Sequence, residues 1–172
     1  YDAPLIEYVS ASRLTEEIAK ILMSGHAADI FRQLLHYGLF LYLQPSAFSF
    51  IEDSPHFSER YFESMAELDR LIAEHAIQRQ GQALVYLIRD FLHLITDWKG
   101  EPRAVYKAVY ADCRHFVLPM NPQRIELEYA VKYCLKQGGL DIRLAGAAKA
   151  KEPTARRPRR YTRQNNAAKR RG

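Results

Sequence analysis

The sequence has few cysteines and no long apolar run. Cys113 and Cys134 are the only two cysteines among 172 residues, and no C-x-x-C spacing suits them to a zinc site. Each lies within an apolar helical pattern, which predicts two buried free thiols. There is no apolar stretch of about 18 residues and no signal-peptide pattern. These absences favour a reducing, cytoplasmic setting and give no reason to expect a membrane partner.

Motifs for catalysis are also missing. The sequence contains no Gly-rich phosphate loop, no G-x-S-x-G turn, no H-E-x-x-H and no D-x-D pair for divalent ions. The six histidines are scattered singly, and we interpret them as hydrogen-bonded or solvent-facing side chains, with His26 as a helix cap. Glu16 and Glu17 are expected to interact with a helix dipole. We therefore predict no catalytic residue, no metal ligand and no cofactor in this chain.

Charge is divided unequally along the chain. The net charge of +5 conceals residues 1–148, where acidic residues outnumber basic ones by four, and residues 149–172, where basic residues outnumber acidic ones by nine. The basic end has one aromatic residue and no aliphatic residue larger than alanine, so burial cannot offset the entropy cost of ordering it. We expect a helical domain over residues 1–140 and a disordered, Ala- and Arg-rich tail over residues 141–172.

Apolar residues recur with the period of an amphipathic helix in the first third of the chain. Ser10 or Ser12 is expected to cap the first helix, which Gly25 ends. Its apolar face is formed by Leu14, Ile18, Ile21 and Leu22. The segments expected next are a helix from about Ala27 to Tyr37, an apolar strap over residues 39–43 and a turn-rich stretch over residues 44–57.

Four more helices are expected in the rest of the chain. Their approximate ranges are 58–80, 83–95, 102–116 and a last helix that ends at Gln137. The segment 83–95 is apolar on most sides, which predicts the centre of a bundle. Asn121 and Pro122 are expected to cap and to begin the last helix. Because no run alternates with period two for long enough to form a sheet, the sequence predicts an all-α fold, a compact bundle of about six helices.

The basic tail carries the main functional signal. Its arginines surround one aromatic ring, so it offers cations for phosphates and a surface on which a base can stack. The tail residues predicted to bind RNA are Arg156, Arg157, Arg159, Arg160, Tyr161, Arg163, Lys169, Arg170 and Arg171. A solubilising tail, or one that meets any polyanion, is the alternative interpretation. Anionic lipid is disfavoured because no amphipathic helix with Trp or Phe accompanies the charges.

Arginines also recur at helical positions outside the tail. They are Arg13, Arg32, Arg60, Arg70, Arg79 and Arg89. Two interpretations stay open, since such residues either line a groove for RNA or form an ordinary solvated face. Arg13 is the residue of this set that we predict to bind RNA.

The first half of the sequence resembles a known family. The run V-S-A-S-R-L-T-E-E-I-A-K-I-L-M-S-G and the following H-Y-G-L-F-L-Y-L-Q-P are similar to the segment after the catalytic head in bacterial poly(A) polymerases and in the related CCA-adding enzymes. The matching positions are Ala11, Arg13, Leu14, Glu16, Glu17, Gly25, Leu34, Leu35, Tyr37, Gly38, Leu39, Phe40 and Pro45. They fall in order and without gaps.

Later stretches resemble the poly(A) polymerase branch. These are QALVYLIRDFLHLITDW, CRHFVLPMNPQRIELEYAVKYCLKQ and the Arg-rich terminus, which is less typical of CCA-adding enzymes. The resemblance covers most of residues 5–137 and is weak over residues 46–80. It implies a helical neck and body that binds the RNA primer, while ATP and Mg²⁺ are held by an amino-terminal head without a counterpart here. Relatives can carry a further helical stretch where Gly138 and Gly139 lead into the linker.

Three functional hypotheses follow. The first is an RNA-binding part of a polynucleotide adenylyltransferase that positions single-stranded RNA 3′ ends with little sequence preference. The second is a helical adaptor that docks RNA helicases or decay proteins through its apolar strap. The third is the body of a tRNA CCA-adding enzyme. Since Tyr1 is not an initiator methionine, we expect the chain to be cut from a longer protein.

Overall fold

The structure is a computed structural model that describes residues 9–142 as helices joined by short loops. The helices are α1 (Ala11–Leu22), α2 (Ala27–His36), α3 (Phe40–Leu43), α4 (Pro45–Asp53), α5 (Pro55–Ala73), α6 (Gln80–Ile95), α7 (Pro102–Phe116) and α8 (Arg124–Gln137). No strand occurs in this range, and the predicted all-α fold is confirmed. Of the tail predicted over residues 141–172, residues 143–172 lie outside the described range.

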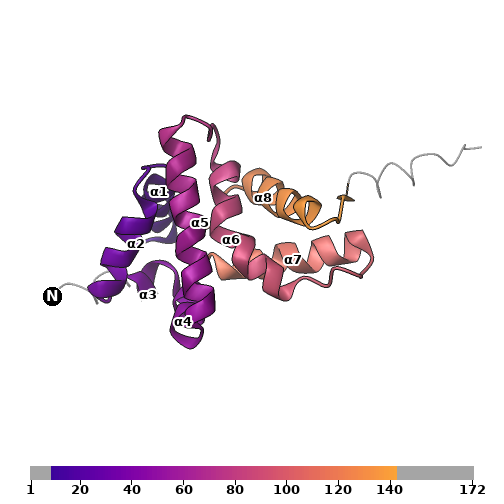
Figure 1. Ribbon diagram of the computed structural model, residues 1–172, viewed down its shortest axis with the longest axis horizontal. Helices are drawn as coiled ribbons and strands as arrows, with labels where there is room; N and C mark the ends of the chain where they lie inside the picture. Colours follow the sequence, from indigo (N-terminus) through magenta and orange to yellow (C-terminus); the bar gives the residue numbers. More distant parts are fainter. Residues whose placement is uncertain (1–8, 143–172) are drawn as a thin grey trace, which may run out of the picture.

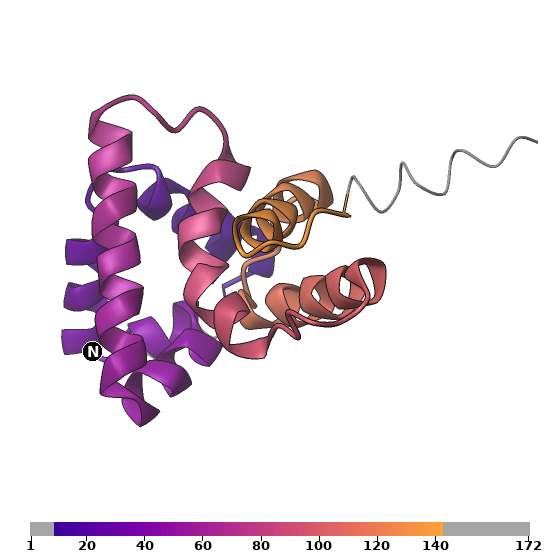
Figure 2. The ribbon, with the colours of Figure 1, turned by 45° about the vertical axis from the view of Figure 1, so that its right-hand side comes forward.

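Helix α6 lies at the centre of the fold (Figure 1). It packs against α1, α5, α7 and α8, and its buried residues point in several directions around its axis. Helices α2 to α5 gather on one side of α6, α7 and α8 lie on the other, and α1 passes behind α6 (Figure 2). The prediction of a central helix from its apolar residues is therefore confirmed.

The segment predicted to be turn-rich is helical instead. Helix α4 begins directly at Pro45, and α5 begins at Pro55. Proline is favoured in the first helical turn because that position needs no backbone N–H donor. Ser54 joins the two helices: its backbone N–H donates to Phe50 at the end of α4, and its side chain accepts from the Phe57 N–H in α5. Both prolines mark helix starts, and with α3 and α4 residues 9–142 form eight helices where about six were predicted.

Other predicted boundaries also differ from the structure. The strap over residues 39–43 contains the one-turn helix α3. Helix α5 stops at Ala73 because His75 adopts a left-handed conformation, with φ at 56°. Asn121 does not cap α8, since its side-chain oxygen accepts from Arg114, and the helix starts after Gln123.

Aromatic rings fill the core where the helices meet. Phe31 and Phe40 pack edge to face, with centroids 5.3 Å apart, and both contact the fully buried Tyr61 of α5. Phe91 of α6 stacks on Phe116 of α7 at 4.2 Å. Burying one such side chain contributes about 1.5–3 kcal/mol. These contacts join distant segments of the chain. The first group holds α2 and α3 to α5, and the second holds α7 to α6.

The two cysteines are buried as free thiols in α7 and α8, as predicted. Burial raises the pKa of both thiols, that of Cys134 to about 12. The thiolate is the reactive form, so these residues behave as small apolar side chains at neutral pH.

A side chain from another helix caps α2. The Asp69 carboxylate of α5 accepts hydrogen bonds from the backbone N–H groups of Ala27 at 2.7 Å and Ala28 at 3.0 Å. His26 occupies the N-cap position but makes no side-chain capping bond, so its predicted role as a cap is wrong. The cap is a tertiary contact because the residues that it joins are 41 and 42 positions apart.

We expect Asp69→Ala to lower the free energy of unfolding by about 1–2 kcal/mol, since two N–H groups at the start of α2 lose their acceptor. Asp69→Asn retains one oxygen and should cost less. Glu59→Ala, at an exposed position of the same helix, serves as the control. Urea denaturation followed by circular dichroism measures all three, and equal midpoints for Asp69→Ala and the control would contradict the capping role.

Candidate nucleic-acid interface

Arg13 is the one residue of the predicted RNA site that lies in the described part of the chain. It is exposed in the first turn of α1, and Ser10, rather than Ser12, caps this helix by accepting from the Arg13 backbone N–H. Within residues 9–142 no carboxylate pairs with its guanidinium, which stays available to an anion. The predicted tail residues, Arg156 to Arg171, lie outside the described range.

Most of the other arginines are engaged within the fold. Arg70 pairs with Glu74, Arg79 with Glu126 and Arg89 with Glu67. Arg32 lies over the Phe62 ring, with its guanidinium carbon 4.7 Å from the ring centroid. A guanidinium held by a carboxylate has fewer donors left for phosphate. Four of these arginines thus already hold a carboxylate or an aromatic ring within the fold.

An open apolar hollow lies where α1, α3 and the loop after α7 meet. Its volume is about 760 Å³, and its lining includes Leu14, Leu41, Tyr42 and Leu118 with one cation, Arg114. Leu41 and Leu118 are exposed there. Behind it the Gln44 side-chain nitrogen, fully buried, donates to the backbone carbonyl of Val117 at 3.1 Å. This bond ties the junction of α3 and α4 to the end of α7.

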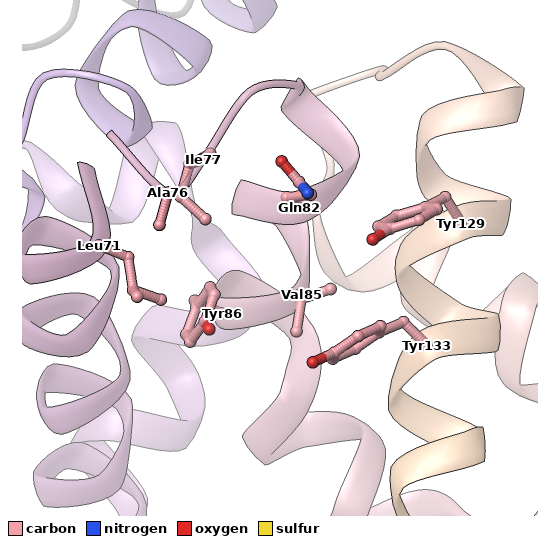
Figure 3. A pocket seen from close by; sticks show the side chains of 8 residues that line it. All are labelled: Leu71, Ala76, Ile77, Gln82, Val85, Tyr86, Tyr129 and Tyr133. Atoms are coloured by element: carbon pink, nitrogen blue, oxygen red, sulfur yellow. The ribbon is translucent and has the colours of Figure 1, made fainter. Parts of the chain in front are cut away.

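A second, smaller pocket opens between α5, α6 and α8 (Figure 3). Its volume is about 160 Å³. It is lined by Leu71, Ala76, Ile77, Gln82, Val85, Tyr86, Tyr129 and Tyr133. The aliphatic side chains come from α5, α6 and the loop between them, while Tyr129 and Tyr133 point from α8 toward α6 (Figure 3). Three tyrosines from two helices thus surround one small space.

Two of these tyrosines continue a row that begins at an arginine. Arg79, which Glu126 of α8 holds, packs on Tyr129, and Tyr133 follows one turn further along α8. We call Arg79, Tyr129 and Tyr133 the tyrosine ladder. The Arg79 guanidinium carbon lies 4.6 Å from the Tyr129 ring centroid, and the Tyr129 and Tyr133 centroids are 6.2 Å apart with their planes inclined by 23°. Tyr133, at the end of the ladder, is 41% exposed.

Glu126 fixes the first member of the ladder. Its two carboxylate oxygens accept from Arg79 Nε at 3.1 Å and from Nη2 at 3.0 Å. The hydrogen bond to Glu126 raises the pKa of Arg79 above its already high value. This bidentate geometry orients the guanidinium plane more firmly than a single contact would.

Gly81 allows α6 and α8 to approach closely beside the ladder. Its backbone N–H donates to Glu126, and a Cβ atom at this position would lie 2.6 Å from Glu126 Oε2 and 2.9 Å from Tyr129 Cδ1. Both distances are shorter than van der Waals contact allows. A larger residue would force Glu126 or Tyr129 to shift, so glycine permits the close approach of the two helices.

Tyr86, on the α6 side of the pocket, is supported by a polar network. Its ring centroid lies 4.8 Å from the guanidinium carbon of Arg89, which also donates to Glu67 at 2.6 Å and to Ser64 at 2.8 Å. Ser64 in turn donates to Asp90 at 2.6 Å. Burial raises the pKa of Asp90, and burial followed by the charge of Glu67 raises the pKa of Tyr86. The phenol thus stays protonated and can donate.

The pocket also offers polar groups without partners in the protein. Gln82 accepts from the backbone N–H groups of Gln78 and Arg79 through its side-chain oxygen, at 2.7 and 3.3 Å. Within residues 9–142, no group accepts from its amide nitrogen, and no hydrogen bond holds the hydroxyls of the three pocket tyrosines. An adjoining hollow of about 210 Å³ adds Lys132 and Lys136 beside the ladder.

Neither a metal site nor a membrane span is found in the described range. Among residues 9–142, no three His, Cys, Asp or Glu side chains gather closely enough to hold an ion. None of the helices there has both the length and the hydropathy that a bilayer crossing requires.

The sequence predictions did not include the pocket. Arg79 was selected only as one arginine of a scattered set. Tyr129 and Tyr133 are spaced four residues apart, which places them on one helix face, and this spacing was the signal available. Tyr86 and Gly81 come from another helix, so their place beside α8 depends on tertiary packing.

Comparison with known proteins gives one match. Residues 2–51 match the model of a family described as "Probable RNA and SrmB-binding site of polymerase A". The searches of curated proteins and of solved structures found no match. The matched segment contains Arg13 and ends within α4. It confirms the resemblance to the RNA-binding region of a poly(A) polymerase and supports RNA as a partner.

We expect Gly81→Ala to lower the free energy of unfolding by about 1–3 kcal/mol through overpacking against Glu126 and Tyr129. Alanine is otherwise better than glycine in a helix by about 1 kcal/mol, so a net loss identifies the close contact. Gln80→Ala, in the same turn, should change stability by less than about 0.5 kcal/mol. Urea denaturation compares the two variants, and a stabilised Gly81→Ala protein would contradict the packing described here.

Proposed function

Because residues 2–51 match the RNA-binding site of polymerase A, we propose that this chain is the RNA-binding region of a polynucleotide adenylyltransferase. In this role it positions the 3′ end of single-stranded RNA for ATP-dependent polyadenylation. The catalytic head that binds ATP and Mg²⁺ lies outside this chain. The family match is the observation that carries the proposal.

The matched segment supplies a suitable surface for RNA. Arg13 projects from α1 with no carboxylate partner in the described residues, so a phosphate can bind it without breaking an ion pair. Arginine suits phosphate because its planar fork donates two parallel hydrogen bonds. A backbone contact of this kind carries no base specificity, which is consistent with weak sequence preference.

The basic tail supplies the larger share of the charge. Its excess of nine positive charges contrasts with the acidic balance of residues 1–148. Counterion release from the RNA backbone favours such a segment regardless of base sequence. In the proposed division, the tail captures the polynucleotide and the helical domain orients it.

A helical adaptor remains the second candidate because the family description also names SrmB binding. The apolar hollow beside α1 and α3 belongs largely to the same segment and exposes Leu41 and Leu118. Capture of a protein by the chain after nuclease treatment, together with no affinity for short single-stranded RNA, would favour the adaptor.

We expect the salt dependence of RNA binding to reveal the contribution of the tail to the affinity. If about five tail cations contact phosphates, log affinity falls against log salt with a slope near −3.5, at roughly 0.7 per phosphate of single-stranded RNA. A chain without residues 149–172 should lose most of this slope. Filter binding of a short oligoadenylate at several salt concentrations measures it, and an unchanged slope would refute the role of the tail.

Arg13→Ala should make the slope of log affinity against log salt shallower by about 0.7, because one phosphate contact is removed. It should also weaken binding uniformly across RNA sequences. Arg103→Ala is the matched control, since Arg103 is also exposed in the first turn of a helix but lies outside the matched segment. Equal slopes for the two variants in the same titration would place the RNA contact elsewhere than α1.

A further inference from the structure

We propose that the pocket between α5, α6 and α8 is a binding site for one unpaired RNA base, which stacks on Tyr133 at the end of the tyrosine ladder. The inference rests on the proposed RNA-binding function, but the site lies outside the segment that the family model matches. It would give the helical domain a contact with bases in addition to phosphates.

Tyr133 is the last ring of the ladder and is partly exposed. Arg79 packs toward one side of Tyr129 and Tyr133 lies one helical turn further along α8, while Tyr133 itself is 41% exposed. Stacking on aromatic rings is the main way in which proteins hold single-stranded bases without reading their sequence. A base placed against Tyr133 would extend the existing order of guanidinium, ring and ring.

The ladder is anchored before any ligand arrives. Glu126 holds Arg79 in two hydrogen bonds, and the close approach at Gly81 fixes Glu126 and Tyr129. Tyr129, the ring on which Tyr133 packs, is therefore already held in place, which lowers the entropy cost of association.

The size of the pocket fits a single ring system. Its volume of about 160 Å³ is below the roughly 300 Å³ at which pockets for whole small ligands begin. The unpaired donors, which are the Gln82 amide nitrogen and the hydroxyls of Tyr86 and Tyr129, can meet the carbonyl oxygens and ring nitrogens at the edge of a base.

Charge beside the ladder suits the attached phosphate. Lys132 and Lys136 line the adjoining hollow together with Tyr129, Tyr133, Ile142 and one carboxylate, Asp141, so its lining carries one more cation than anions. Lys132 also lies over the Tyr106 ring, with Nζ 5.3 Å from its centroid. Within residues 9–142 no salt bridge engages either lysine, whereas Arg79 and Arg89 are already paired. The two amines can therefore bind phosphate without giving up a carboxylate.

The experiment measures the affinity of the full chain for a short labelled oligoadenylate by fluorescence anisotropy. Tyr133→Ala should weaken binding by about 5- to 100-fold, the range for loss of one stacked base, with an unchanged salt slope because no charge is removed. Tyr133→Phe keeps the ring and should bind within about twofold of the unaltered chain. The double change Lys132→Gln and Lys136→Gln should instead reduce the slope by about 1.4.

Ile125→Ala is the matched control, because Ile125 is exposed on the same helix and lies outside the pocket. Circular dichroism checks that each variant is folded. A 2-aminopurine base in the RNA gives a second readout, because stacking on Tyr133 should quench its emission. The quenching should be weaker with Tyr133→Ala and as strong with Tyr133→Phe as with the unaltered chain.

The outcomes separate the base site from the broader function. If the unaltered chain binds RNA and Tyr133→Ala binds equally well, the base site is wrong and RNA binding stands. Equal losses of RNA affinity for Tyr133→Phe and Tyr133→Ala would indicate a contact through the hydroxyl instead of stacking, and would also overturn the proposal. If the unaltered chain fails to bind RNA, the proposed function itself fails.

Discussion

The burial of α6 on several sides is the constraint on which the rest of the structure depends. A helix that is apolar around most of its circumference is stable only when neighbours cover it, and α1, α5, α7 and α8 do so. This requirement brings together helices from the matched segment and from the later half of the chain. It also places α8 beside the start of α6, where Gly81 removes the side chain that would separate them.

Much of the fold could be predicted from the sequence because the apolar periodicity is strong. The all-α class, the central helix and the range Pro102–Phe116 are confirmed. The errors arose where a local signal has two meanings. Pro45 and Pro55 suggested turns but begin helices, and the cap of α2 comes from Asp69, about forty residues away, which no local pattern reveals.

The candidate sites were predictable to a smaller extent. Composition alone identifies the basic tail, and Arg13 was selected from the recurring arginines and lies in the run whose family resemblance the match to residues 2–51 confirms. The pocket could not be predicted, because Tyr86 and Tyr129 meet only through packing between α6 and α8. Of its features, the spacing of Tyr129 and Tyr133 was the one visible in the sequence.

The buried amide of Gln44 has a consequence for how this molecule can be divided. The match ends at residue 51, yet Gln44 donates to the carbonyl of Val117, and α2 takes its cap from Asp69. An excised peptide spanning only the matched region would lose both partners and expose rings such as Phe31 to water. The matched segment is therefore shorter than the folded domain, and a minimal expression fragment has to extend through α8, which covers α6.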